Sequence, residues 1–347
     1  MKLNKLVSVE KYIQQSLYDK ESGYYLKKNP IGTKGDFITS PKISFIFSEM
    51  IAIWIISFWI SLGKPKFFNI VELGPGDGSL CKTLLSVFEK FPDFNNSIKI
   101  YLHEISPRLR KIQKQKIKSK KTFWINNFNN INKGPILFFG NEFFDALPIK
   151  QYEKKKSEIF ERFVKFEKNS KHKIILKKVN KKVKNILKKY QLTKKKGVIE
   201  FPALGLKKID IIIRKLTKNK GGILLIDYGF LKNHNVSTLQ AIKSHRKSEV
   251  FKNFGKADIT SLVNFKLLKQ YLKMKNMKTN KIVSQGFFLK RTGILERAEI
   301  LSKNMTFKEK SDIYFRVDRL INTKQMGELF KVLFTYNTDK KFSLGFK

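Results

Sequence analysis

Three glycines and a proline lie close together in the stretch "IVELGPGDGSL", residues 70–80. Residues 67–73 before them are apolar and predict a buried parallel strand, whereas residues 79–91 repeat apolar side chains every three or four positions and predict a helix. Glycines at such a junction allow a tight turn and leave room for a ligand against the backbone. The stretch therefore predicts a nucleotide-type binding turn whose candidate residues are Glu72, Gly74, Pro75, Gly76 and Gly78.

A second acid, Glu104, ends the next predicted strand, residues 98–104. A carboxylate at the end of the strand after a glycine turn can accept hydrogen bonds from both ribose hydroxyls of an adenosine. The alternative is that Glu104 caps the helix that begins at "EISP" or is an ordinary surface acid. Because Glu104 is paired with the glycine turn, we favour ribose binding as its role. The neighbouring His103 alternates onto the other face of the strand, where we expect packing rather than chemistry.

Further polar residues follow two later strands. Asn141, Glu142 and Asp145 lie in "GNEFFDALP", directly after an apolar strand predicted at residues 135–140. If a helical turn begins there, the two acids face one pocket; alternatively, Asn141 and Asp145 cap the turn before "ALPI". Asp227 ends the strand predicted at 221–229, where it lines a cleft or caps the next turn. These positions are the candidates for acid–base chemistry.

The elements that must position these residues alternate between strands and helices. Besides the segments named above, we predict helices at 7–19, 43–62, 107–117 and about 203–218. Such alternation is typical of an α/β fold with a mainly parallel sheet, flanking helices and ligands at the carboxyl ends of the strands. Residues 157–179 alternate like an antiparallel hairpin that turns at "KNSK", within an insertion near 150–200. We also predict a strand pair near 281–290.

Charge is the unusual feature of the composition. The 347 residues contain 72 Lys and Arg against 28 Asp and Glu, a formal net charge of +44. This excess fits a nucleic-acid or acidic-membrane partner. However, 63 of the basic residues are Lys and only 9 are Arg, spread over the whole chain, and Arg is the better phosphate ligand. We therefore favour compositional drift over a dedicated anionic partner, so nucleic acid remains the less favoured interpretation.

Compartment and metal content follow from simpler signals. Cys81 is the only cysteine, which excludes a disulfide within the chain and makes a cysteine-built metal site implausible, so we expect no metal. The first twenty residues lack the apolar core of a signal peptide. The most apolar stretch, residues 50–63, is too short to span a bilayer and predicts a buried helix. We expect a bacterial cytoplasmic protein without a transmembrane segment.

The E-x-G-x-G-x-G turn with its second-strand acid resembles the S-adenosyl-L-methionine site of class I methyltransferases. More specific stretches narrow the resemblance to the MidA family, which includes the mitochondrial complex I assembly methyltransferase and its bacterial relatives. They are "SGYYLKKNPIGTKGDFITSPKISFIFSE" (22–49), "GNEFFDALPIKQYE" (140–153), "GGILLIDYGF" (221–230), "STLQAIKSHR" (237–246) and "MGELFKVL" (326–333). The resemblance covers residues 8–334, nearly the whole chain.

This resemblance implies a Rossmann-like class I methyltransferase fold with an N-terminal helical cap and an antiparallel β insertion. It implies a cap and lid loop over residues 1–62 and a methyltransferase domain over 63–347. "GDFITSP" then forms a lid in which Gly35 and Asp36 help bind the cofactor, the alternative being an ordinary turn-rich connection.

The implied activity is S-adenosyl-L-methionine-dependent protein arginine methylation, directed at a subunit of NADH:quinone oxidoreductase. Glu142 is then the acid that binds the substrate guanidinium, with Asp145 and Asn141 beside it. An RNA methyltransferase and a non-catalytic assembly factor that binds the cofactor are the alternatives. Lys42 stands where family members often carry an acid, and we expect this departure to leave the cofactor turn untouched.

Overall fold

The structure, a computed structural model, describes residues 6–27, 39–167, 172–232, 235–243 and 245–347. The chain divides into two compact units. The sheet unit comprises residues 38–143, 211–229 and 272–347, and the hairpin unit comprises residues 1–37, 144–210 and 230–271. The domain boundary predicted at residue 62 stays a prediction, because compact units need not be the parts that fold independently.

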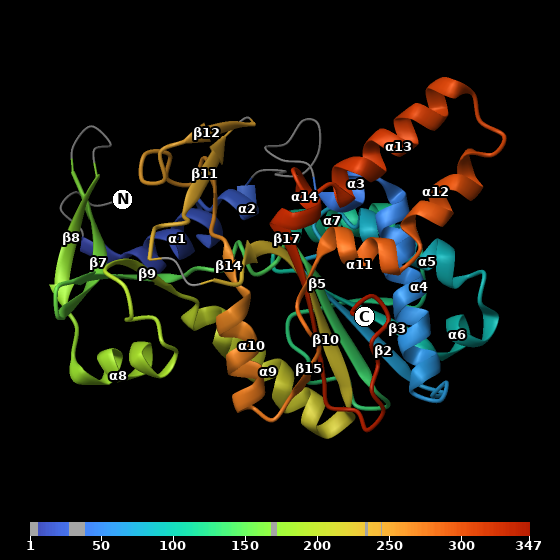
Figure 1. The fold of residues 1–347 in the computed structure, drawn as a ribbon, viewed down its shortest axis with the longest axis horizontal. Helices are drawn as coiled ribbons and strands as arrows, with labels where there is room; N and C mark the ends of the chain where they lie inside the picture. Colours follow the sequence, from blue (N-terminus) through green and yellow to red (C-terminus); the bar gives the residue numbers. More distant parts are fainter. Residues whose placement is uncertain (1–5, 28–38, 168–171, 233–234, 244) are drawn as a thin grey trace. The chain divides into compact units, whose positions relative to one another are not determined.

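A mainly parallel sheet forms the centre of the sheet unit (Figure 1). Its strand order is β15-β17-β10-β5-β2-β3-β4, in which β10, β5, β2, β3 and β4 are parallel neighbours and β17 runs antiparallel to β10. The strands are β2 (Phe68–Leu73), β3 (Ile98–His103), β4 (Thr122–Ile125), β5 (Ile136–Asn141), β10 (Gly221–Phe230), β15 (Lys278–Thr279), β16 (Val283–Ser284) and β17 (Phe330–Tyr336). The carboxyl ends of the parallel strands therefore meet at one edge, as the alternating sequence pattern predicts.

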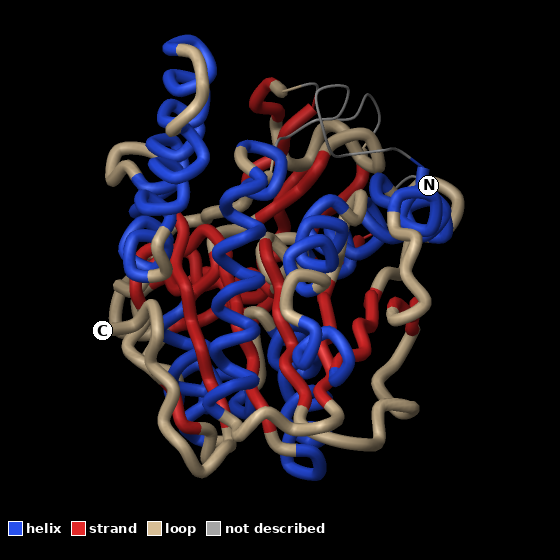
Figure 2. Tube along the Cα trace, turned by 90° about the vertical axis from the view of Figure 1, so that its right-hand side faces the viewer, coloured by secondary structure: helices blue, strands red, loops and turns tan. Residues whose placement is uncertain are grey.

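Helices pack beside the strands of this sheet (Figures 1 and 2). They are α3 (Ser40–Ile43), α4 (Phe45–Ser61), α5 (Ser79–Phe88), α6 (Pro92–Ser97), α7 (Pro107–Lys116), α11 (Gln285–Arg291), α12 (Ile294–Ser302), α13 (Phe307–Ile321) and α14 (Met326–Leu329). The helices α9 (Ala203–Asn219) and α10 (Phe265–Met274) each contain a boundary between the two units. One hydrophobic cluster joins residues of α4, α5 and α11 to the sheet strands.

Residues 50–61 of the apolar stretch lie within α4, which is apolar on nearly all sides and largely buried. Its Trp54 and Phe58 are fully buried and stack with ring centroids 5.9 Å apart. This confirms a buried helix. In the described part of the chain, no helix has both the length and the apolar character needed to cross a membrane.

The hairpin unit is built around antiparallel strands. It contains β1 (Leu6–Ser8), α1 (Val9–Tyr18), α2 (Tyr24–Lys27), β6 (Lys150–Lys155), β7 (Glu158–Phe166), β8 (His172–Lys178), α8 (Lys181–Lys189), β9 (Gly197–Phe201), β11 (Gln240–Lys243), β12 (Arg246–Ser248), β13 (Asp258–Thr260) and β14 (Val263–Asn264). Strands β7 and β8 pair antiparallel over their lengths, which confirms the predicted hairpin. Its "KNSK" turn, residues 168–171, lies outside the described residues.

The strand pair predicted near 281–290 was wrong, whereas the helix predicted at 43–62 is confirmed as α4 with slightly shifted ends. Residues 281–290 do not form a strand pair, because β16 is only two residues long and α11 follows at once; β16 pairs instead with β17. The helix predicted at 43–62 is preceded by a separate short helix, α3, because Ser44 adopts an extended conformation and its hydroxyl caps α4 by accepting from Ile46 N at 3.3 Å.

Candidate active site

The polar residues singled out in the sequence gather at the carboxyl edge of the sheet in the sheet unit. Glu72 lies in β2, and Glu104 follows β3. Asn141 ends β5, which lies between β2 and β10, and Asp227 lies near the end of β10. Parallel pairing places these strand ends side by side, so residues far apart in the sequence form one region.

The glycine turn depends on a backbone conformation that glycine adopts without strain. Gly74, Gly76 and Gly78 have φ values of 64°, 55° and 79°, in the left-handed region. A Cβ atom on Gly74 would also lie 2.7 Å from Cδ2 of Phe143, so the turn and the segment after β5 pack directly together. Gly78 then precedes α5 as its N-terminal cap residue. The backbone is therefore shaped for close approach, as the sequence predicts.

Gln113 of α7, which was not predicted from the sequence, forms a hydrogen bond with the backbone of this turn. Its side chain is fully buried, and Nε2 donates to Gly76 O at 2.7 Å while Oε1 accepts from Trp124 Nε1 at 2.8 Å. The same Nε2 lies 3.4 Å from Glu104 Oε2. The available signal was a glutamine four positions after the buried Leu109, on the apolar face of the predicted helix.

Glu72 is an ionisable group enclosed in the sheet. It is 3% exposed, and its Oε2 has no hydrogen-bond partner among the described residues. Burial, followed by the nearby charges of Asp77 and Glu104, raises its pKa to about 8. A buried carboxyl with an unsatisfied oxygen suits a cationic or hydrogen-donating ligand.

Glu104 is neither a surface acid nor the cap of α7. It is 6% exposed, and its Oε1 accepts from Ser106 N at 2.8 Å. The capping residue of α7 is Ser106, whose hydroxyl accepts from Leu109 N at 3.3 Å. Burial raises the pKa of Glu104, although the Ser106 N–H and Gln113 oppose this effect. The alternative role considered from the sequence therefore belongs to a neighbour. His103 packs against Phe128, with ring centroids 5.1 Å apart, as expected.

Asn141 and Glu142 stand together where β5 ends. Glu142 has φ of 53°, an unfavourable conformation for a side chain of this kind, and its N–H donates to Ile226 O at 2.9 Å. Its Oε1 accepts from Asn141 Nδ2 at 3.0 Å and from Ser40 N at 3.2 Å. Asn141 Oδ1 is buried and has no hydrogen-bond partner among the described residues. Strain at a partly exposed acid points to a functional role.

Asp227 braces this segment from β10. Its carboxylate is 2% exposed and accepts from Phe143 N at 3.2 Å and from Tyr228 N at 3.0 Å. Of the two roles considered from the sequence, these contacts support the structural one. Asp227 therefore fixes the backbone of Phe143, which follows Glu142, and that of Tyr228, which follows Asp227 itself.

The remaining predicted residues are not placed beside this group. A turn forms at residues 144–147, where Leu147 N donates to Phe144 O at 3.2 Å, rather than the helical turn from Glu142 that we considered. Asp145 belongs to the hairpin unit, where it is 5% exposed and its carbonyl accepts from Ser261 N at 3.0 Å. Its pairing with Glu142 stays a prediction. Gly35 and Asp36, and with them most of the predicted lid, lie outside the described residues.

Asp77, within the glycine turn, is the second residue that the sequence analysis missed. Its Oδ2 lies 2.7 Å from Lys42 Nζ and 2.6 Å from Lys116 Nζ, and its Oδ1 accepts from Ser79 N at 3.1 Å. Burial alone would raise the pKa of Asp77, but the hydrogen bonds from the two lysines prevail and lower it to about 2. Lys42 therefore does contact the cofactor turn, contrary to our expectation.

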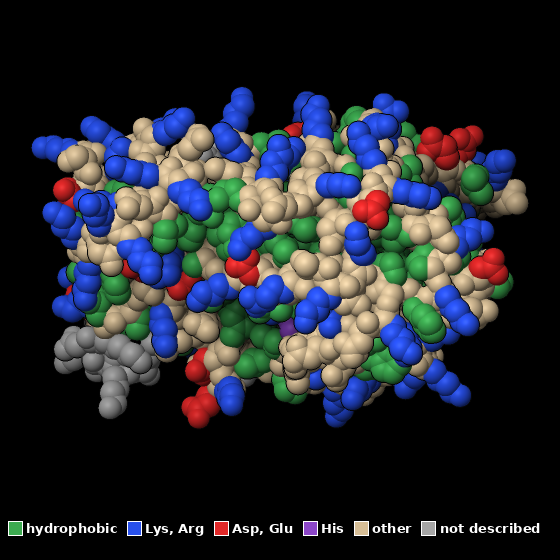
Figure 3. Space-filling model, turned by 90° about the horizontal axis from the view of Figure 1, so that it is seen from below, with side chains coloured by type: hydrophobic (Ala, Val, Ile, Leu, Met, Phe, Trp, Pro, Cys, Tyr) green, Lys and Arg blue, Asp and Glu red, His purple; other side chains and the backbone are tan. Residues whose placement is uncertain are grey.

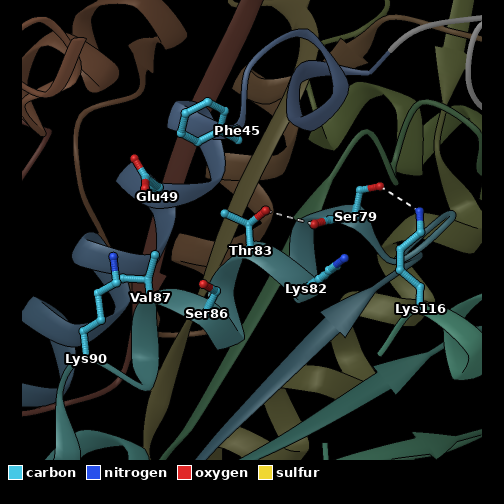
Figure 4. A pocket seen from close by; sticks show the side chains of 9 residues that line it. All are labelled: Phe45, Glu49, Ser79, Lys82, Thr83, Ser86, Val87, Lys90 and Lys116. Carbon is cyan, nitrogen blue, oxygen red and sulfur yellow. Dashed lines mark hydrogen bonds between the residues drawn. The ribbon is translucent and has the colours of Figure 1, made fainter. Parts of the chain in front are cut away.

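A hollow of about 540 Å³ is lined by residues of α4 and α5 (Figure 4). Ser79, Lys82, Thr83 and Ser86 face it from the helix, and Lys116 reaches it from α7 with Nζ 2.9 Å from Ser79 Oγ. None of the glycines of the turn lines this hollow. We therefore place the candidate active site at the strand ends.

The residues present at those ends fit S-adenosyl-L-methionine. The turn offers backbone in a conformation that lets a ligand approach, Glu72 offers an unsatisfied carboxyl oxygen, and Glu104 offers a second carboxylate at the neighbouring strand. S-adenosyl-L-methionine combines cationic groups with an adenosine ribose, and carboxylates can pair with the first and accept hydrogen bonds from the second.

Comparisons with known proteins agree with this chemistry. Residues 50–283 match the model of a family described as "Putative S-adenosyl-L-methionine-dependent methyltransferase". The chain is 28% identical to the mitochondrial protein arginine methyltransferase NDUFAF7 of Danio rerio, over 96% of this chain and 84% of the relative. It is 30% identical to the protein of the same name from Xenopus tropicalis, over 94% of this chain and 81% of the relative.

A crystal structure of a Burkholderia thailandensis protein bound to S-adenosyl-homocysteine has the same fold. The TM-score is 0.82 at 20% identity, and the match covers 99% of this chain and 89% of that one. This likeness confirms the predicted class I methyltransferase fold. The family match covers well over half of the chain and confirms the enzyme class and the cofactor expected from the sequence. This protein therefore belongs to that family of S-adenosyl-L-methionine-dependent methyltransferases, as its resemblance to MidA implied.

Proposed function

We propose that this chain is a protein arginine N-methyltransferase whose substrate is a subunit of NADH:quinone oxidoreductase. The names of the relatives support arginine as the target and a protein as the substrate. The MidA resemblance supports a complex I subunit. A bacterial cytoplasmic location remains part of the same proposal.

Within this function, the cofactor is held by the turn and its two flanking acids. Gly74, Pro75, Gly76 and Gly78 provide the backbone against which it lies, Glu72 faces its cationic groups, and Glu104 accepts from its ribose. Gly35 and Asp36 would cover it from the preceding loop. The unsatisfied Oε2 of Glu72 supports this arrangement, because a bound cation would supply its missing partner.

The chemistry asks the protein to align two reactants and to remove a proton. When bound, S-adenosyl-L-methionine supplies a sulfonium methyl group for in-line attack. A guanidinium is protonated, with a pKa above about 12, and is therefore a poor nucleophile. Glu142 would bind two of its N–H groups, localise its charge and take up the proton lost on methylation. Asn141 Oδ1, which lacks a donor among the described residues, would accept a further N–H.

The observation that carries this assignment is the strained, partly exposed Glu142 beside the unsatisfied Asn141 Oδ1 at the end of a central strand. The test is to incubate the purified protein with isolated complex I subunits and labelled cofactor, and then to map the label by mass spectrometry. Label on arginine of one subunit supports the proposal. Label confined to lysine or to added RNA would contradict it.

The positive charge gives no specific support to the RNA alternative. Figure 3 shows Lys and Arg side chains spread over the visible face, with few Asp and Glu between them. Scattered lysines bind polyanions weakly and without sequence preference, and this binding falls steeply with salt. Sequence-selective RNA methylation at physiological salt would restore that alternative.

Cofactor affinity should depend on the protonation of Glu72. Because the pKa of Glu72 is about 8 and the cofactor is cationic, ionised Glu72 is expected to bind it more tightly. Affinity should therefore fall by about tenfold or more from pH 9 to pH 6.5, since one pKa unit corresponds to about 1.4 kcal/mol. Calorimetry across this range checks the expectation, and Glu72→Gln should bind weakly at every pH. An unchanged pH profile in this variant would exclude Glu72 as the titrating group.

The same variant separates binding from folding. A carboxyl with a folded-state pKa of about 8, against 4.5 ordinarily, holds its proton more tightly after folding. Its contribution to stability is therefore present below pH 4.5 and is lost as the pH rises from there to about 8. Cofactor-free Glu72→Gln should accordingly match wild type at pH 5 and exceed it at pH 9, by up to about 4 kcal/mol, in denaturant unfolding.

Gln113→Leu should weaken cofactor binding by roughly tenfold or more, because it removes the side chain that holds Gly76 O and leaves buried polar groups without partners. Gln285→Leu is the matched control. Gln285 is equally buried and donates to Leu320 O at 3.0 Å, away from the turn. Both variants should lose stability in thermal unfolding, but only Gln113→Leu should lose affinity. Equal affinities would show that Gln113 serves the fold alone.

A further inference from the structure

The short helix α3 connects the cofactor turn to Glu142. Within four residues it carries Ser40, whose N–H donates to Glu142 Oε1 at 3.2 Å, and Lys42, whose Nζ lies 2.7 Å from Asp77 Oδ2. One end of this connection is thus the proposed acid, and the other is the turn that receives the cofactor.

Packing and polar contacts together hold α3, whose Ile43 is buried in the hydrophobic cluster of the sheet unit. A four-residue helix has almost no intrinsic stability, and the side chain of its cap residue, Thr39, makes no capping hydrogen bond. Arg316 of α13 donates to Ile43 O at 3.3 Å, which anchors the far end. Lys42 is the one charged residue of this helix, and its ion pair with Asp77 is the contact that ties α3 to the glycine turn.

Asp77 is well suited to hold a neighbouring segment. Its side chain is 10% exposed, so the ion pairs are partly shielded from water. Ser79 N fixes the other carboxylate oxygen, which sets the direction of Oδ2. A carboxylate oriented by the backbone of the turn can therefore transmit the position of the turn to whatever it binds.

We propose that Asp77 is a positioning residue that, through Lys42 and α3, places Ser40 N where it orients the carboxylate of Glu142. This proposal rests on the proposed role of Glu142 as the guanidinium-binding acid. The cofactor turn and the substrate acid are then coupled by one ion pair. We call the chain from Asp77 through Lys42 and Ser40 to Glu142 the α3 clasp.

Lys116 provides a matched control. Its Nζ contacts the same Oδ2 at 2.6 Å, and its side chain is 28% exposed, as is that of Lys42. It comes from the end of α7, however, and lines the hollow beside α5 (Figure 4). Lys42→Gln and Lys116→Gln therefore remove one equivalent charge each from the same carboxylate, but only the first releases α3.

The test compares these variants at saturating cofactor. Lys42→Gln should lower kcat by roughly tenfold with cofactor Kd changed less than about threefold, since small misplacement of a reacting group is costly to rate. Lys116→Gln should keep kcat within about threefold of wild type. Asp77→Asn should lose as much as Lys42→Gln, and combining the two should add little, as for residues that act as a unit.

Hydrogen–deuterium exchange gives a readout independent of catalysis. The Ser40 amide should exchange faster in Lys42→Gln than in Lys116→Gln or wild type. Equal effects of the two lysine variants on kcat and exchange would overturn the proposal, leaving Asp77 a purely electrostatic role. Faster exchange with unchanged kcat would also overturn it, provided that Glu142→Gln is itself inactive. If exchange increases as expected but Glu142→Gln is fully active, the clasp is supported and the proposed function of Glu142 is the part that fails.

Discussion

Glu142→Gln is expected to lower methyl transfer by about 10²-fold or more while leaving cofactor binding intact. The substitution keeps the size of the side chain and one carbonyl acceptor, so Asn141 and Ser40 can still donate to it. It removes the negative charge that would localise the guanidinium charge and the basic oxygen that would take up its proton. Initial rates with labelled cofactor, together with calorimetry of cofactor binding, measure the two effects separately.

Two further variants control for structure. Glu142→Gly should relieve the strain of a φ of 53° but also removes the acceptor of Asn141 and Ser40, so stability should change little while activity is lost. Asp145→Asn should cause a smaller loss if Asp145 only supports its turn, and a similar, non-additive loss if the two acids act as a pair. A Glu142→Gln protein that methylates at the wild-type rate would rule out this acid, and a protein that does not fold would show that Glu142 is structural.

The sequence was sufficient for most of the parallel sheet and for the glycine turn after β2. Strand β2, helix α5 and strand β3 begin and end within a few residues of their predicted bounds, because buried strands and amphipathic helices leave clear periodic patterns. Glycine punctuation then located the turn. The pairing of β16 was predicted wrongly because two residues of pairing leave no pattern, and its partner β17 lies far along the chain.

The connections between the predicted site residues could not be derived from the sequence. Gln113 and Lys116 reach the turn at Gly76 and Asp77 through contacts across 37 and 39 positions. Ser40 reaches Glu142 across 102 positions. A polar residue in a helix or a lysine after a proline has no local signature for such a partner. Periodicity reports which face of an element is buried, whereas hydrogen-bond partners depend on how separate elements pack.

Gly76→Val is expected to weaken cofactor binding by at least about 100-fold, because two effects act together. The φ of 55° is unfavourable for a branched side chain, and a Cβ at the turn would occupy space that the ligand needs. Gly63→Val is the matched control. Gly63 has φ of 86° in the same unit, but a Cβ there would meet no atom within 4 Å. Both variants should therefore lose about 1–2 kcal/mol of stability from backbone strain, and calorimetry should show lost affinity only for Gly76→Val.

Wild-type affinity in Gly76→Val would place the cofactor elsewhere than this turn. An equal loss of affinity in both variants would mean that strain spreads through the sheet unit and that the experiment reports folding. A loss of affinity in Gly76→Val alone would establish that the glycines after β2 are required by the ligand, because both variants place a valine at a positive φ.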